Sequence, residues 1–347
     1  MIICRGEEKC CFALVALPQS ILLIKLSGDI DMNGKRNRVT LAVDLGGTKV
    51  MVGEVLKDGT VLNSKKYPSV VKDQVSASEC IMECICDYID TFGIKLGDIV
   101  SIGIGVVGRV DRENGIWIEI DPGRSNKVEL AKLIEEKFGV QCKVENDVNC
   151  ATIAEMKLGW GRKTNNFIYL NVGTGIAIGT VVDGQLVRGS HFNSGEVGHF
   201  VVDVNSDVTC PCGRKGCLEV YASGLGLDKR IKALKKEYQD TKLEVREDEP
   251  CNLEKVFELY DEGDKLCVKV IDDAVKMLSA TIMNLVRVSD PDAIVLGGGV
   301  VSNGWLIKKI KENLHPKTMR FVTNGVVLSD LNINHIGLIG AAMVGFE

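Results

Sequence analysis

Residues 39–49 read VTLAVDLGGTK, an apolar run that ends in a pair of glycines. The run has the length of a buried strand, and the glycines behind it indicate a tight turn. Two more strands are expected at 50–56 and 60–66, with Asp58-Gly59 as the hairpin turn between them. A strand that enters a glycine turn and is followed by a hairpin predicts an α/β domain with a mixed sheet.

The second half of the chain repeats this beginning. A strand at 167–172 is expected to enter a glycine turn, and strands at 176–182 and 186–188 to follow as a pair. A further strand at 293–296 also enters a run of glycines. Two comparable halves predict a duplicated architecture with a cleft between the halves.

These elements suggest a division of the chain into two domains. An N-terminal α/β domain is expected at 39–148, completed by a C-terminal helix at 335–347, and a second α/β domain at 149–334. Residues 1–38 show little periodic pattern and are expected to lie outside the fold as an extension, of which 1–31 precede Met32. In the first domain, Ser76 and Glu79 have the spacing of a capping box at a helix start.

The bulk composition excludes several classes of protein. The 347 residues carry 42 Lys and Arg against 47 Asp and Glu, a net charge of −5, which gives no electrostatic case for a nucleic-acid partner. No apolar run reaches the roughly 20 residues of a membrane span. We therefore expect a cytoplasmic protein with neither a nucleic-acid nor a membrane partner.

Three glycine turns are candidates for binding nucleotide phosphates, at 44–49, 171–175 and 296–300. Each follows an apolar strand, exposes backbone N–H groups and lets a phosphate approach closely. Thr48 and Thr174 add hydroxyl donors, and Asp44 stands where it could hold a hydrated Mg²⁺. The chain has no G-x-x-x-x-G-K-[ST] loop, which excludes a P-loop enzyme.

One cluster has the spacing of a zinc site. His199 is followed by Cys210, Cys212 and Cys217, the last three in the string CPCGRKGC. Three thiolates and one imidazole at this spacing predict a closed tetrahedral site, in which the zinc is structural because no coordination position stays open. We interpret the other ten of the 13 cysteines as small buried hydrophobes in a reducing compartment.

Three carboxylates near these motifs are candidates for a substrate site. Glu196 lies three residues before His199, and Glu219 lies two residues after Cys217, so a bound zinc would hold both in place. They could accept sugar hydroxyls, or they could be supporting or surface charges. Asp147 directly follows an expected strand at 141–145, where it could simply be the N-cap of the next helix.

Together these motifs resemble those of the ROK family, which includes bacterial sugar kinases and transcriptional repressors. The resemblance covers residues 39–345 and rests on the strings DLGGTK (44–49), END (145–147), NVGTGI (171–176), GEVGH (195–199), CPCGRKGCLE (210–219) and LGGGV (296–300). It implies an actin-like ATPase fold, in which two ribonuclease-H-like α/β domains surround a hinged cleft.

The resemblance also implies a role for each candidate residue. The nucleotide would be ATP, bound at Asp44, Gly46, Gly47, Thr48, Lys49, Gly173, Thr174, Gly175, Gly298, Gly299 and Val300. A hexose would be held by Asn146, Asp147, Glu196, His199 and Glu219. Asp147 corresponds to the catalytic base of the family, and His199 would face the zinc with one ring nitrogen and the sugar with the other.

The implied activity is transfer of the γ-phosphate of ATP to a hexose hydroxyl, with glucose as the default acceptor and glucose 6-phosphate as product. N-acetylglucosamine, N-acetylmannosamine and fructose remain alternatives, because the segments 105–111 (GVVGRVD) and 119–124 (EIDPGR) depart from the usual pattern of the family. The repressors carry an N-terminal helix-turn-helix module, for which the 38 residues before the first strand lack the amphipathic helices and basic stripe. Homodimers are common in the family, so a homodimer is expected.

Overall fold

The computed structural model describes residues 38–347 except 48, 70–71, 93–97 and 122. The extension expected at 1–38 therefore lies outside the described residues except for its last position. Thr48, which the sequence analysis assigns to the nucleotide site, also lies outside the described residues.

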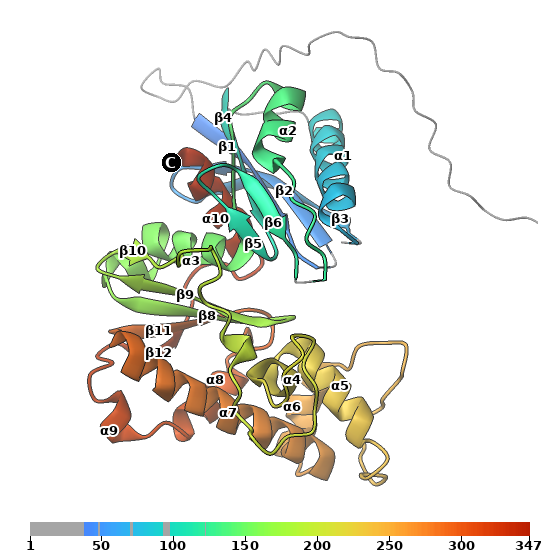
Figure 1. The fold of residues 1–347 in the computed structure, drawn as a ribbon. Helices are drawn as coiled ribbons and strands as arrows, with labels where there is room; N and C mark the ends of the chain where they lie inside the picture. The colour runs from blue at the N-terminus through green and yellow to red at the C-terminus, as the bar shows by residue number, and fades with distance from the viewer. Residues whose placement is uncertain (1–37, 48, 70–71, 93–97, 122) are drawn as a thin grey trace, which may run out of the picture.

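The first sheet has the strand order β3-β2-β1-β4-β7. Its strands are β1 (Arg38–Leu45), β2 (Lys49–Leu56), β3 (Val61–Pro68), β4 (Asp98–Val106) and β7 (Cys142–Asn146). The first three strands are antiparallel neighbours, whereas β4 runs parallel to β1 and β7 parallel to β4. Helices α1 (Gln74–Phe92) and α2 (Leu130–Phe138) pack their apolar residues on one face of this sheet (Figure 1). A short hairpin of β5 (Arg109–Asp111) and β6 (Ile116–Glu119) follows β4.

The second sheet has the order β10-β9-β8-β11-β12 and repeats the plan of the first. Its strands are β8 (Phe167–Val172), β9 (Ile176–Val182), β10 (Gln185–Leu186), β11 (Ala293–Gly297) and β12 (Gly325–Leu328). A helical layer covers its far face and consists of α4 (Leu218–Ala222), α5 (Gly224–Leu234), α6 (Leu253–Asp261), α7 (Lys265–Ser289), α8 (Trp305–Glu312) and α9 (Pro316–Met319). In both sheets a central strand has a hairpin on one side and parallel strands on the other.

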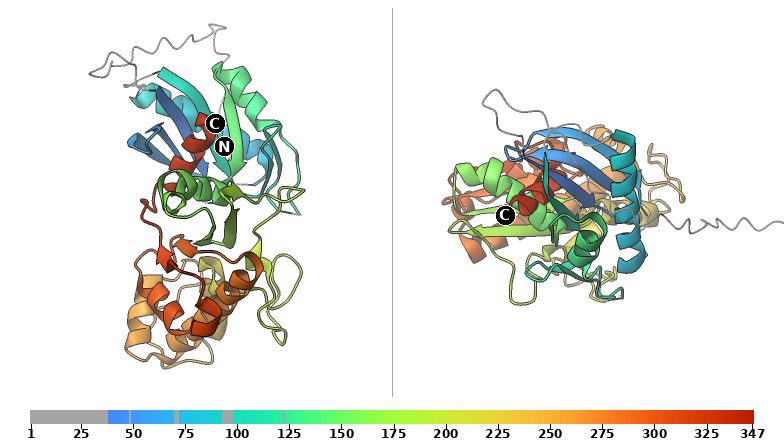
Figure 2. Two further views of the ribbon diagram at one scale, coloured as in Figure 1. Left: turned by 90° about the vertical axis from the view of Figure 1, so that its left-hand side faces the viewer. Right: turned by 90° about the horizontal axis from the view of Figure 1, so that it is seen from above.

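Two helices, α3 (Asp147–Leu158) and α10 (Ile336–Phe346), form a layer between the sheets (Figures 1 and 2). One core cluster joins their apolar residues to those of both sheets. Glycines let the backbones touch, since a Cβ at Gly340 would lie 1.8 Å from the carbonyl oxygen of Cys150, and one at Gly103 would lie 1.9 Å from that of Ala341. Such contacts leave no room for a side chain and fix how α10 packs against α3 and β4.

The capping box expected at Ser76 and Glu79 is wrong. Helix α1 begins at Gln74, and Asp73 accepts the N–H of Ser76 at its Oδ1 over 2.8 Å, so Asp73 takes the capping role. Elsewhere the described part of the chain contains no helix with the length and apolar character needed to cross a bilayer.

Candidate active site

Asp147 begins helix α3 at the carboxyl end of β7. The N-cap is Asn146, whose Oδ1 accepts the N–H of Asn149 at 3.0 Å, so Asp147 is not the simple N-cap that its position first suggested. The Asp147 Oδ1 accepts the N–H of Val148 at 2.9 Å and the Asn146 Nδ2 at 3.0 Å. Two donors therefore fix the Oδ1 of the carboxylate, and the side chain as a whole is only partly buried.

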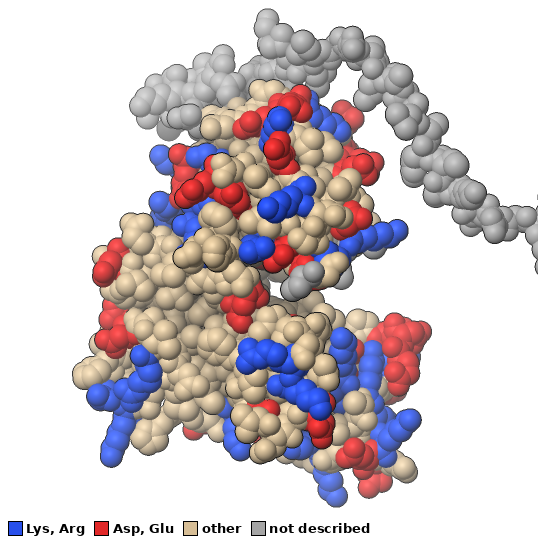
Figure 3. All heavy atoms as spheres, viewed as in Figure 1, with Lys and Arg blue, Asp and Glu red and all other residues tan. Residues whose placement is uncertain are grey.

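The surroundings of Asp147 favour its protonated form. Burial, together with the negative charges of Asp44 and Glu196, raises the pKa of Asp147 to about 7. Burial likewise raises the pKa of Asp44 to about 6 and the pKa of Glu196, the latter with help from Glu219. These effects form a series of carboxylates from Asp44 through Asp147 and Glu196 to Glu219, in which each acts electrostatically on the next. A space-filling view shows a hollow between the two lobes, with acidic side chains at its inner end (Figure 3).

The residues of the predicted zinc site lie together. The ligand atoms of His199, Cys210, Cys212 and Cys217 are within 4.8 Å of one another. The Cys210 Sγ lies 3.5 Å from the His199 Nδ1, and the Cys212 Sγ lies 3.6 Å from the Cys217 Sγ. A tetrahedral zinc with bonds of about 2.3 Å to sulfur and about 2.0 Å to nitrogen separates its ligands by about 3.5–3.8 Å. The donor set and its spacing therefore fit zinc.

Glu219 connects this knuckle to the second glycine turn. It lies in the first turn of α4, two residues after the candidate ligand Cys217, and its Oε2 accepts the N–H of Ile176 at 3.1 Å. The start of α5 also contacts the turn, because Gly224 donates its N–H to the carbonyl of Gly173 at 2.8 Å. The candidate metal ligands, an acidic side chain and a candidate phosphate turn thus form one connected unit.

The third glycine turn lies beside the second. Val300 donates its N–H to the carbonyl of Val172 at 3.0 Å, and a Cβ at Gly298 would lie 2.4 Å from that oxygen. Gly298 also has a φ of 93°, so both its conformation and its contacts require glycine. In the first turn the N–H of Gly46 bonds the carbonyl of Lys49 at 2.9 Å.

Several contacts of the site are not visible in any sequence motif. A Cβ at Gly337, near the start of α10, would lie 2.6 Å from the Oδ2 of Asp44, so the missing side chain makes room for that carboxylate. Asn146 also donates from Nδ2 to the carbonyl of Gly108 at 2.8 Å, which connects it to the loop before the β5–β6 hairpin. The helical spacing of Gly337 and Gly340 indicates that this helix packs closely on a neighbour, but it does not identify Asp44 as the residue beside Gly337.

The two segments that depart from the family pattern have defined contacts. The Arg109 Nε lies 3.0 Å from the Oε1 of Glu119. Arg109 also donates from Nη1 to the carbonyl of His191 at 3.5 Å, a residue in the second half of the chain. The Arg124 Nε donates to the Oδ2 of Asp121 at 2.8 Å. Arg109 therefore connects the β5–β6 hairpin to the loop before Glu196.

Paired sheets of this topology, with a helical layer between them and glycine turns at the ends of their central strands, define an actin-like ATPase fold, and the predicted fold class is confirmed. Residues 40–345 match the model of the ROK family. The chain belongs to the ROK family, as its motifs indicated.

Known proteins similar to this chain include kinases and a regulator. The glucokinase of Streptomyces coelicolor is 30% identical over 89% of this chain and 98% of its own. A ROK family glucokinase from Streptomyces griseus, solved in complex with glucose and AMPPNP, is 25% identical with a TM-score of 0.74, over 89% of this chain and 99% of that one. A ROK family transcriptional regulator, a homolog of the E. coli MLC protein, has the same identity and TM-score over 89% of this chain and 78% of its own.

Proposed function

We propose that this chain is an ATP-dependent sugar kinase that phosphorylates a hexose hydroxyl, with Asp147 as general base. The observation that carries the proposal is the fixed orientation of the Asp147 carboxylate, whose Oδ1 accepts hydrogen bonds from the Asn146 Nδ2 and the Val148 N–H. Its pKa of about 7 suits a group that must take a proton near neutral pH. The glucokinases among the relatives, one of them with glucose and an ATP analogue bound, support the same activity.

In this mechanism Asp147 accepts the proton of the attacking hydroxyl at Oδ2, and the hydroxyl oxygen attacks the γ-phosphorus of ATP in line. Backbone N–H groups of the turns at Gly46–Lys49 and Gly173–Gly175 would bind the phosphates, and the turn at Gly298–Val300 would lie against the adenosine. Asp44 would hold a hydrated Mg²⁺, which supplies positive charge to the phosphates when bound. Closure of the proposed domains, 39–148 with 335–347 and 149–334, would exclude water.

The sugar would lie against Asn146, Glu196, His199 and Glu219. The cysteines and His199 would hold a structural zinc, which fixes the knuckle and the neighbouring glutamates rather than taking part in phosphoryl transfer. Because the His199 Nδ1 faces Cys210, its Nε2 is the nitrogen left for a sugar hydroxyl.

Glucose is the proposed acceptor, with phosphate transferred to the C6 hydroxyl. N-acetylglucosamine, N-acetylmannosamine and fructose are the alternatives, because Arg109 and Arg124 stand in segments that differ from the usual family pattern. A panel of these four hexoses with ATP and Mg²⁺, read by ADP release and by identification of the sugar phosphate, tests both the reaction and its acceptor. Absence of turnover with every sugar would contradict the proposal.

A sugar-sensing regulator is a second candidate, because a ROK family transcriptional regulator matches this fold as well as a glucokinase does. The same panel separates the two functions if each sugar is also tested for binding by isothermal titration. A regulator binds a sugar without consuming ATP, whereas the kinase consumes ATP only with its acceptor.

The proposal includes a cytoplasmic homodimer. The motifs shared with the ROK family, in which homodimers are common, support this view. Light scattering after size exclusion measures the oligomeric state directly.

A further inference from the structure

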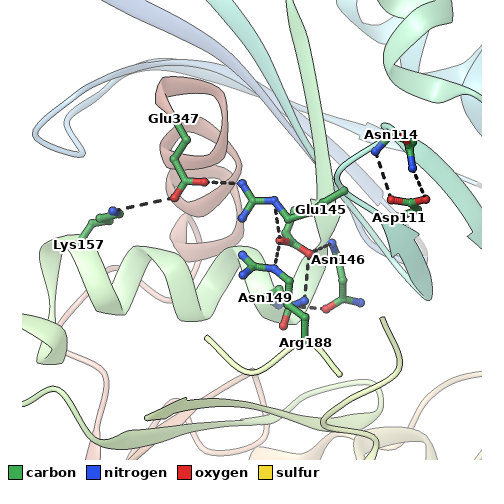
Figure 4. Close-up of polar contacts among 9 residues, drawn as sticks. Asp111, Asn114, Glu145, Asn146, Asn149, Lys157, Arg188 and Glu347 are labelled. Atoms are coloured by element: carbon green, nitrogen blue, oxygen red, sulfur yellow. Dashed lines mark hydrogen bonds and ion pairs between the residues drawn. The ribbon is translucent and has the colours of Figure 1, made fainter. Parts of the chain in front are cut away.

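Glu145 is a buried carboxylate beside the proposed base, and the mechanism above gives it no role. Its side chain is 2% exposed. Oε1 accepts the N–H of Asn146 and the Nδ2 of Asn149, both at 3.0 Å. Oε2 lies 2.9 Å from the Nε of Arg188 and 3.7 Å from the Nε of Arg112 (Figure 4). Both oxygens of the carboxylate are therefore bound.

The groups that Oε1 binds belong to the turn that carries Asp147. Asn146 donates from Nδ2 to the Asp147 Oδ1, and its own Oδ1 accepts the N–H of Asn149, each at 3.0 Å. Glu145 thus fixes the main chain directly before Asp147 and a side chain two residues after it. The orientation of the Asp147 carboxylate depends on this set of bonds.

Arg188 reaches Glu145 from the opposite sheet. Glu145 lies on β7 of the first sheet, whereas Arg188 follows β10 at the edge of the second. Arg112, from the turn between β5 and β6, is in addition paired with Glu347, the last residue of the chain. The turn before α3 is therefore held from both sheets and from the C-terminus.

A purely stabilising role explains this arrangement poorly. The net stability gained from a buried ion pair is small, since desolvation offsets the attraction between the charges. A reacting group, by contrast, must be held to within a fraction of an ångström by its supporting residues. We propose that Glu145 and Arg188 are positioning residues that hold Asn146 and Asp147 in the geometry for proton abstraction, an inference that rests on the proposed kinase function.

The test compares Glu145→Gln, Arg188→Gln, Arg188→Lys and the double variant E145Q/R188Q, with the hexose of the panel that the wild-type enzyme phosphorylates fastest. Arg230→Gln is the matched control. Arg230 is also a mostly buried arginine in an ion pair, with Asp273, but the pair joins α5 to α7 on the far side of the second sheet. The Arg230→Gln variant therefore measures how far Tm falls when a comparable ion pair outside the site is removed.

We expect kcat to fall about 10- to 100-fold in Glu145→Gln and Arg188→Gln, because small displacements of a catalytic group have effects of this size. The Kd for the hexose should stay within about 2-fold of the wild-type value. Arg188→Lys should recover part of kcat. The double variant should be no slower than Glu145→Gln, because the two substitutions break the same ion pair between Glu145 and Arg188. Arg230→Gln should keep the wild-type kcat, with a fall in Tm like that of Arg188→Gln.

A kcat within about 2-fold of wild type in both single variants would overturn the inference, and so would a loss of kcat that Arg230→Gln reproduces. If a single variant does not fold, the double variant decides the question: a reduced kcat supports the inference and a normal kcat contradicts it. A wild-type enzyme that phosphorylates no hexose overturns the proposed function together with this inference, whereas normal variants of an active enzyme overturn this inference alone.

Discussion

At the scale of single residues, the Asp147 carboxylate is held in one orientation by the two donors to its Oδ1. Replacing it with Asn removes the proton acceptor but keeps the shape of the side chain and its bond to Val148. We expect Asp147→Asn to lower kcat by about 10²–10⁴-fold while hexose binding survives, because general-base catalysis has this magnitude. The measurement is kcat from ADP release together with Kd from isothermal titration. Asp290→Asn, at an exposed helix end, is the control, and near-normal turnover of Asp147→Asn would remove this residue from the role.

The charge of Asp44 provides a second test at the same scale. A general base works only when deprotonated, so kcat/KM should rise with pH through the pKa of Asp147, about 7 in the free enzyme. Burial is the larger cause of that value, and the negative charge of Asp44 adds to it. Asp44→Asn removes this charge, so the acid limb of the pH profile should move to lower pH, even though turnover itself becomes slower. An acid limb at the same pH in both proteins would contradict the assigned interaction.

At the scale of elements, the zinc knuckle is expected to order the acidic residues on either side of it. Cys212 is exposed, so Cys212→Ser removes a metal ligand at little direct cost to the core. We expect zinc to fall from about one per chain to near zero and the KM for the hexose to rise at least about 10-fold, because Glu196 and Glu219 lose their fixed positions. Elemental analysis and steady-state kinetics measure the two effects.

Cys86→Ser is the matched control for the knuckle, because Cys86 lies on α1 and is partly exposed. This variant should keep both its zinc and its KM. Loss of zinc from Cys212→Ser with an unchanged KM would show that the knuckle does not position the sugar site.

The sequence predicted elements better than it predicted contacts. The strand expected at 167–172 is β8, and the glycines of the last helix do allow close packing, because local pattern and small residues carry that information. The capping box at Ser76 failed because Asp73, just outside the motif, competes for the same N–H group. The bonds from Glu219 to Ile176 and from Arg188 to Glu145 each join residues 43 positions apart, so only the tertiary arrangement reveals them.

At the scale of the whole molecule, the site occupies the place where the two repeated halves meet. The layer of α3 and α10 shares one apolar core with both sheets, and the Asp147 end of α3 is the end that faces Asp44 and Glu196. Carboxylates gathered there are held in a less polar environment than water, which costs stability in their charged form. The arrangement that suits proton abstraction therefore works against folding at neutral pH.

This conflict predicts how stability depends on pH. The pKa values of Asp44 and Asp147, about 6 and 7 in the folded chain, lie above the value of 3.8 that applies when the chain is unfolded. Between about pH 4 and pH 7 the folded state therefore binds more protons, so the free energy of unfolding falls as pH rises through that window. The double variant D44N/D147N should lose this slope and be more stable than wild type at pH 8 by several kcal/mol, since each unit of pKa shift corresponds to about 1.4 kcal/mol. Urea unfolding at pH 5 and pH 8 measures the effect, with Asp290→Asn as control, and equal slopes in the wild-type protein and the double variant would show that these carboxyls ionise in the folded chain as they do in water.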